Sequence, residues 1–310
     1  MNILIEITAP VFLVIGAGYL MVWRRIFTDS HIHGIMIYTQ GFAIPCLLFA
    51  AILNMDLART LRPALILSFY GGSTACFICG LAAARWWFKR SWEDSIAVGF
   101  AVLFSNTVLL GLPIVGRAYG GTALEATFAL VALHAPYCYF VGITAMEMVR
   151  SESSGIRATI RQTGRVMFGN ALMLGILLGF IFNLLDLPVP NIAHEALDMI
   201  AASALPAALF GLGGVIVRYR PEGDLRLILF IATTSLVLHP LISWILSAFI
   251  FALETDLVRS AVITAAMAPG INAYIFSSMY KRAQRVVAAS VLLATGLSVF
   301  TASIWLWLMA

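Results

Sequence analysis

Two short polar stretches interrupt long apolar runs in this sequence. The first is FSNTVLLGLP at residues 104–113, and the second is APGINAY at residues 268–274. Each places a helix breaker and an asparagine, Asn106 or Asn272, near the middle of an apolar run. A break inside a membrane helix exposes backbone N–H groups at the start of one half-helix and carbonyl groups at the end of the other. The two stretches therefore predict a pair of interrupted helices that form a binding site within a membrane.

Apolar runs fill most of the rest of the chain. The 310 residues are 61% hydrophobic and 11% charged, whereas a soluble domain carries about 25% charged residues. Each run is close to the roughly 20 residues that a helix needs to cross a bilayer. The sequence predicts an all-α polytopic membrane protein with ten transmembrane helices, of which the fourth and ninth are interrupted. The runs cover residues 3–23, 34–54, 63–84, 95–117, 122–148, 166–185, 196–217, 226–252, 257–280 and 286–309.

The basic residues predict how these helices are oriented. Fifteen of the 19 lysines and arginines fall in the first, third, fifth, seventh and ninth gaps between runs. By the positive-inside rule these gaps are cytoplasmic, and an even number of spans then places both termini on the external side. The basic rim would face anionic lipid headgroups, and no basic run is long enough to indicate nucleic-acid binding. We expect a multi-pass protein of the inner or plasma membrane.

The chain divides into two similar halves. A polar cytoplasmic linker at residues 150–165 separates residues 1–149 from residues 166–310, with five runs on each side. The pattern A-x-P-x-x-L-F occurs at residues 43–49 and again at residues 204–210, an offset of 161. Similar halves with an odd number of spans insert in opposite orientations. This predicts two inverted five-helix repeats in which the interrupted helices occupy matching places.

Four further helix breakers lie inside the predicted spans. Pro45 and Pro206 fall in the two matching motifs of spans two and seven, and Gly111 and Pro113 follow Asn106 in span four. Proline removes a backbone hydrogen bond and kinks a helix, and the freed carbonyl needs another partner inside a bilayer. We expect these positions to act as helix breaks or hinges. The alternative is a kink that serves packing alone.

The two interruptions supply the candidate substrate-binding residues. Asparagine inside a span is costly unless it is paired or faces a cavity, and its amide offers both donors and acceptors without a charge to desolvate. The alternative is that both amides bond across helices. The predicted binding residues are Ser105, Asn106, Thr107, Pro269, Gly270 and Asn272.

Two histidines are the candidates for proton coupling. His134 and His239 lie within predicted spans next to prolines, whereas no acidic residue has a mid-span position. Histidine titrates near neutral pH, so either one could couple proton movement to transport. The alternative is a neutral histidine that bonds the carbonyl freed by the nearby proline. Cys76 and Cys79 have CxxC spacing but no second pair and no nearby histidine, so we expect neither a metal nor a cofactor.

The interruptions resemble those of a known family. The segment Ser105-Asn106-Thr107-x-x-x-Gly111-Leu112-Pro113, followed by Tyr119-Gly120, is similar to the N-T-x-x-x-G-x-P…Y-G segment of the auxin efflux carriers. So is Met267-Ala268-Pro269-Gly270-x-Asn272-Ala273, followed by Tyr280. Plant members have a proline before the first Asn-Thr, where this chain has Ser105, so the position at which span four unwinds is open.

The resemblance covers essentially the whole chain and implies a fold and an activity. The bacterial branch of the family includes malonate transporters, and the fold is shared with bile acid:sodium symporters. Spans four and nine would cross at their breaks, in a transport domain that moves against a scaffold. The implied activity is transport of small organic anions.

The leading interpretation is a secondary carrier of small organic anions, either mono- or dicarboxylates, driven by alternating access. A sodium-coupled symporter and a non-transporting membrane sensor are the alternatives. No P-loop, paired acids or Ser-His-Asp set is visible, which disfavours ATP-driven transport and an enzyme. The small-xxx-small motif Gly175-x-x-x-Gly179 indicates internal packing or a sliding surface, with a homodimer face as the alternative.

Overall fold

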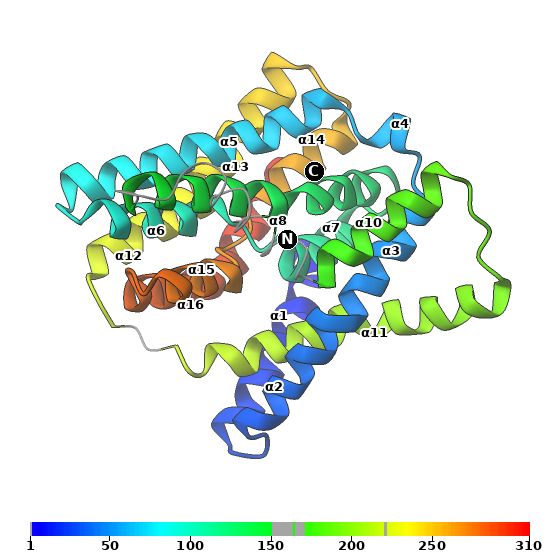
Figure 1. Cartoon of the computed structure of the whole chain (residues 1–310), viewed down its shortest axis with the longest axis horizontal. Coiled ribbons are helices and arrows are strands. Elements are labelled where there is room, and N and C mark those ends of the chain that lie inside the picture. The colour runs from blue at the N-terminus through cyan, green and yellow to red at the C-terminus, as the bar shows by residue number, and fades with distance from the viewer. Residues whose placement is uncertain (1, 151–163, 165–170, 220–221) are drawn as a thin grey trace.

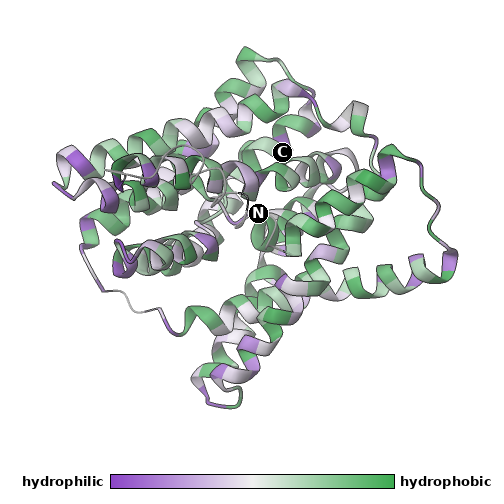
Figure 2. Ribbon diagram, viewed as in Figure 1, coloured by the Kyte–Doolittle hydropathy of each residue, from purple (hydrophilic) through white to green (hydrophobic). Residues whose placement is uncertain are grey.

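The computed structural model describes residues 2–150, 164, 171–219 and 222–310. Within these ranges the secondary structure is helical apart from one isolated β-bridge. Hydrophobic residues run along the helix bodies, and hydrophilic ones gather toward helix ends and loops (Figure 2). The predicted linker at residues 150–165 lies almost wholly outside the described residues.

Seven of the described helices are long and apolar enough to cross a bilayer. Several contain π-helical turns, labelled η. The seven are α1 (Asn2–Trp23); α2 (Asp29–Tyr38) with η1 (Thr39–Ala43) and α3 (Ile44–Leu53); α5 (Pro63–Ala82) with η2 (Ala83–Trp87); α8 (Gly121–Arg150); α11 (Asn191–Ile216); α12 (Leu225–Thr233) with η4 (Thr234–Leu238), α13 (His239–Trp244) and η5 (Ile245–Ile250); and α16 (Gln284–Leu308).

Three of the ten predicted spans are not among these seven helices of the described residues. The fourth consists of α6 (Trp92–Leu103) and, after a break, η3 (Thr107–Gly111) with α7 (Leu112–Ala118). The ninth consists of α14 (Thr255–Ala265) and α15 (Ile271–Tyr280). The sixth contains α10 (Ala171–Leu184), and a further short helix, α4 (Leu57–Thr60), precedes α5. The structure therefore shows the predicted interruptions but not ten continuous spans.

Helices continue through the other predicted breakers. Ile44, the residue before Pro45, donates its N–H to the carbonyl of Thr39. Leu112, the residue before Pro113, donates its N–H to the carbonyl of Thr107. Each bond spans five residues and closes a π-helical turn. Because proline has no N–H to donate, the wider π-helical turn lets the helix continue past it. Gly111 ends η3 with helical dihedral angles, and Pro206 lies inside α11. None of these four residues interrupts its helix, and hinge motion at them stays a prediction.

The helices pack as two groups, visible in Figure 1 as a panel to the right and below and a core to the left and above. In the panel (α1, α2–α3, α10 and α11), α1 packs against α11 and α10 packs against α3. In the core (α5–α8 and α12–α16), α5 contacts α6 and α13, and α8 contacts α14. The two groups touch where α1 meets α7 and α16, and where α3 and α10 meet α8.

Glycines bring the panel helices into backbone contact. A Cβ added at Gly18 of α1 would lie 1.9 Å from the carbonyl oxygen of Phe210 in α11. In the other pair, a Cβ at Gly175 of α10 would lie 2.4 Å from the carbonyl oxygen of Pro45, and one at Gly179 would lie 3.2 Å from that of Phe49. The Gly175-x-x-x-Gly179 motif therefore packs against α3 of the same chain.

The contact at Gly18 predicts an unusual response to alanine. Alanine normally favours a helix over glycine by about 1 kcal/mol, but at Gly18 its methyl would meet a backbone carbonyl that cannot turn aside. We expect Gly18→Ala to be destabilising by about 1–3 kcal/mol, measured as a lower thermal midpoint in detergent. Gly16→Ala is the matched control, since nothing lies within 4 Å of a Cβ there. A Gly18→Ala midpoint at or above that of the unsubstituted chain would contradict the close approach.

Candidate functional site

The two helix breaks bind each other through their backbones. Ser105 and Pro269 form an isolated antiparallel bridge. Asn106 donates its N–H to the carbonyl of Ala268 at 2.8 Å, and Gly270 donates its N–H to the carbonyl of Phe104 at 2.8 Å. The bonds are carried by the neighbours of Ser105 and Pro269, so the bridge needs no N–H from the proline. Each break thereby satisfies polar backbone groups of the other, as a membrane interior requires.

The local sequence accounts for where each helix stops and restarts. Proline at position 269 cannot donate and disfavours a helical conformation at the residue before it. On the other strand of the bridge, Phe104 and Asn106 are non-helical, and the side chain of Asn106 caps the next helix by accepting from the N–H of Leu109 at 3.3 Å. Span four therefore unwinds at residues 104–106 and not at Gly111 or Pro113.

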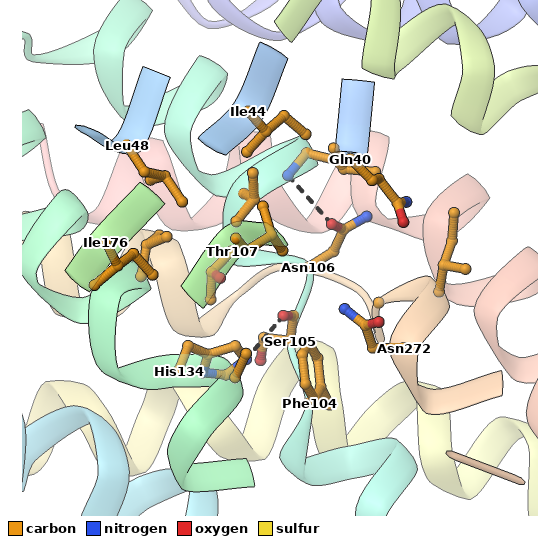
Figure 3. Close-up of a pocket in the computed structure, with 17 residues that line it drawn as sticks. Gln40, Ile44, Leu48, Phe104, Ser105, Asn106, Thr107, His134, Ile176 and Asn272 are labelled. Carbon is orange, nitrogen blue, oxygen red and sulfur yellow. Dashed lines mark hydrogen bonds between the residues drawn. The ribbon is translucent and has the colours of Figure 1, made fainter. Parts of the chain in front are cut away.

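A cavity of about 50 Å³ lies beside this bridge, between core and panel. In Figure 3 the side-chain amides of Gln40, Asn106 and Asn272 gather on one side, and Ile44, Leu48 and Ile176 lie on the other. No lining residue carries a charged side chain. The remaining lining residues are Phe104, Ser105, Thr107, Val108, Leu109, Val131, His134, Ala135, Leu172, Gly270 and Ile271.

The starts of two half-helices face the cavity. Thr107, Val108 and Leu109 come from the first turn of η3, and Ile271 and Asn272 come from the first turn of α15. The first N–H groups of a helix have no partner within it, and the helix dipole places partial positive charge there.

The asparagine amides are oriented so that their donors are available. The Oδ1 atom of Asn106 accepts from the N–H of Leu109, and that of Asn272 accepts from the hydroxyl of Tyr139 at 3.3 Å. Because protein donors engage both oxygens, the NH₂ groups are left to meet a ligand. These oxygen and nitrogen positions follow from the hydrogen-bond network. The amides thus add hydrogen-bond donors to the partial positive charge at the helix starts.

Five of the six predicted binding residues line the cavity. Pro269 is the exception, since it lies in the bridge beside it. The sequence interpretation missed Gln40 and Tyr139. Gln40 is a polar residue within an apolar run and is followed by Gly41, so the signal that identified the asparagines was also present here. Tyr139 reaches Asn272 from 133 positions away, a contact that no local pattern records.

Both candidate coupling histidines bond to Ser105. His134 Nε2 lies 3.0 Å from the Ser105 carbonyl oxygen, and His239 Nδ1 lies 3.2 Å from the Ser105 hydroxyl. The Nε2 atom of His239 lies 3.3 Å from the carbonyl oxygen of Phe69. A proline frees the carbonyl four residues before it, which is that of Ala132 for Pro136 and that of Leu236 for Pro240. Neither histidine bonds to these carbonyls. The Leu236 carbonyl, four residues before Pro240, instead accepts from the Trp305 indole at 2.9 Å.

Two further hollows lie on one side of the cavity and share lining residues with it or with each other. Gln40 and Ile271 also line a hollow of about 550 Å³ between α2, the end of α11 and α15. That hollow shares Arg218, Tyr219 and Tyr274 with a third one, whose lining includes Arg285. The rings of Tyr219 and Tyr274 lie 5.1 Å apart between the two hollows. Elsewhere in the described chain, Arg117 of α7 donates to the carbonyls of Glu6 and Ile7 on α1.

Interrupted helices that meet at an internal cavity are typical of membrane transporters. A family model for membrane transport proteins matches residues 3–306, and the chain belongs to this family, which contains the auxin efflux carriers. With seven helices in its described part that are long and apolar enough to cross a bilayer, it is an integral membrane protein. A relative from Rhizobium meliloti (strain 1021) named "Putative malonate transporter" is 25% identical over 270 residues, which cover 86% of this chain and 83% of the relative. Auxin efflux carrier component 8 of Arabidopsis thaliana is 20% identical over 343 residues, which cover 93% and 92% of the two chains.

The two asparagines differ in what they support, which predicts different effects of substitution. Asn106 caps η3, and losing a helix cap costs about 0.5–2 kcal/mol, so Asn106→Ala should lower both the thermal midpoint and ligand binding. Asn272 has no capping bond and accepts from the Tyr139 hydroxyl, so Asn272→Ala, combined with Tyr139→Phe to remove the donor that would be left unpaired, should weaken binding of a small carboxylate at an almost unchanged midpoint. Binding and melting of both purified variants check this. Equal loss of stability in the two variants would contradict the assigned roles.

Proposed function

We propose that this chain is a secondary carrier of small organic anions that works by alternating access. The observation that carries the proposal is the cavity between panel and core, where two helix starts and the NH₂ groups of Asn106 and Asn272 present hydrogen-bond donors. Such donors can bind a carboxylate without a buried cationic side chain. Membership of a membrane transport family supports transport over chemical conversion.

The proposed substrate is a small mono- or dicarboxylate. The relative named as a malonate transporter supports a dicarboxylate. Dipoles and amides suit one negative charge better than two, because each buried charge must be compensated. A dicarboxylate would therefore be carried most readily together with a proton.

The proposed topology is two inverted five-helix repeats, residues 1–149 and 166–310, with residues 150–165 as a cytoplasmic linker and both termini outside. The glycine contacts support it: Gly18 faces Phe210 as Gly179 faces Phe49, and each residue lies 161 positions from its counterpart. The charge bias places Arg218 and Arg285 on the cytoplasmic side.

The proposed cycle moves the core against the panel. A water molecule needs about 10–15 Å³, so a cavity of about 50 Å³ holds a few waters and must widen for a dicarboxylate. Residues of both groups line it, namely Gln40, Ile44, Leu48, Leu172 and Ile176 from the panel and the rest from the core. Relative movement would therefore open it. The hollow beside Gln40 and the one next to it, lined by Arg218 and Arg285, support a conformation that is nearer to opening on the cytoplasmic side.

Two alternatives stay open. A sodium-coupled symporter would use the same fold with an added cation site. No group of three or more His, Cys, Asp or Glu side chains that could hold a metal ion occurs among the described residues, but carbonyl oxygens can also bind sodium. A sensor that does not transport would bind the anion without flux. Transport measured with and without sodium separates all three.

Uptake by proteoliposomes tests the proposed function. Labelled malonate and a panel of mono- and dicarboxylates are supplied with and without imposed proton and sodium gradients. We expect saturable uptake of at least one anion, reduced about tenfold or more in Asn272→Ala because a hydrogen bond to a charged group is lost.

Asn54→Ala is the matched control, since this amide lies at the end of α3 and bonds only within its own helix. It should transport at the unsubstituted rate. Binding without flux under every gradient would favour a sensor, and neither binding nor flux would refute the organic anion class. Normal flux in Asn272→Ala would refute the assigned site.

A further inference from the structure

We propose that His239 is a proton-binding site whose protonation turns the Ser105 hydroxyl toward the substrate, so that a proton and an anion are carried together. The proposal rests on the carrier function proposed above and assigns its coupling ion and the coupling residues. It starts from the fact that the break at Ser105 is bonded to two buried histidines.

The carbonyl partners fix the tautomers of both rings. A carbonyl only accepts, so His239 donates through Nε2–H to Phe69, and His134 donates through Nε2–H to Ser105. The Nδ1 atom of a neutral His239 then carries a lone pair. Ser105 lies 3.2 Å away and must donate its hydroxyl proton to that lone pair. In this state the only hydroxyl proton of Ser105 is directed at the histidine.

Protonation of His239 reverses that bond. A proton from solution forms an N–H bond on the Nδ1 lone pair, and no bond of the protein breaks. The Ser105 hydroxyl keeps its own proton and rotates, so that its oxygen accepts from Nδ1–H. Its O–H is then free to donate elsewhere, and Ser105 lines the cavity. The cavity thereby gains one hydrogen-bond donor and a neighbouring positive charge, both of which favour an anion.

His134 lacks this capacity. Its Nδ1 atom faces the Cys138 sulfur at 3.8 Å, and a thiol is a weak acceptor. A proton added there would be a poorly satisfied buried donor. The two histidines therefore differ in role, although both contact Ser105: His239 binds the proton, and His134 holds the backbone of the break.

No charged side chain among the described residues competes with Ser105 for the Nδ1 atom of His239. The titratable groups near the pair are Tyr70 of α5, whose hydroxyl donates to the Leu130 carbonyl, and Cys138 of α8. On α14, which packs against α13, Asp256 and Arg259 lie in the first turns and contact each other. Among the described residues, no carboxylate, lysine or arginine is within hydrogen-bond distance of either histidine. An anion in the cavity is thus the natural counter-charge for a protonated His239.

The test compares two transport modes in proteoliposomes that contain the full chain. Malonate uptake driven by an inward proton gradient requires coupling, whereas malonate–malonate counterflow at equal pH does not require net proton movement. We expect His239→Gln to lose gradient-driven accumulation and to keep counterflow with a KM raised about tenfold, the effect of one hydrogen bond to a charged group. His134→Gln should be slower but should still respond to the gradient, and His194→Gln, a half-buried histidine that pairs with Asp198 away from the cavity, should match the unsubstituted chain.

Two further measurements keep the proposal testable if His239→Gln does not fold. An entrapped pH dye in the unsubstituted chain should report internal acidification during malonate uptake. Ser105→Ala should transport with a KM that no longer falls at acidic pH. Malonate flux without acidification, or gradient-driven accumulation in His239→Gln, would overturn the proton site while the carrier function stands. Absence of all flux in the unsubstituted chain would instead refute the carrier function and, with it, this proposal.

Discussion

Two reciprocal backbone hydrogen bonds between the helix breaks are the constraint on which the rest of this structure depends. A broken helix leaves orphan N–H and carbonyl groups, and each costs several kcal/mol in a hydrocarbon environment. The bonds Asn106–Ala268 and Gly270–Phe104 satisfy them across the crossing, so neither break is stable without the other. The same crossing directs two helix starts at one cavity and brings Ser105 within reach of His134 and His239.

The packing around the crossing separates what is fixed from what can move. Inside the panel, Gly18 and Gly175 allow backbone-to-backbone contact, which leaves little freedom for sliding. Between panel and core, the cavity and the hollow beside Gln40 interrupt the contact surface. The substrate site lies on this interrupted boundary, which is where relative motion of two rigid groups would change its access.

The sequence predicted the breaks, the apolar runs and five polar or glycine residues of the cavity lining, because breakers and amides inside apolar runs are local signals. It did not decide between Asn106 and Pro113 as the position of the first break, since a π-helical turn lets a helix continue through proline. It also missed Gln40, and its alternative for the histidines, a bond to the carbonyl freed by the nearby proline, is wrong. Those features depend on which helices meet, and residues such as Phe69 and Ser105 are brought to His239 only by the crossing.

The central claim is that the crossing forms the anion site. The most direct measurement is a cryo-electron microscopy structure of the chain with malonate, bound to an antibody fragment for alignment. The account predicts density for the anion beside Asn106 and Asn272, within hydrogen-bond distance of the backbone N–H groups at the start of α15. Malonate density between Arg218 and Arg285 alone, with the cavity at the bridge unoccupied, would contradict it.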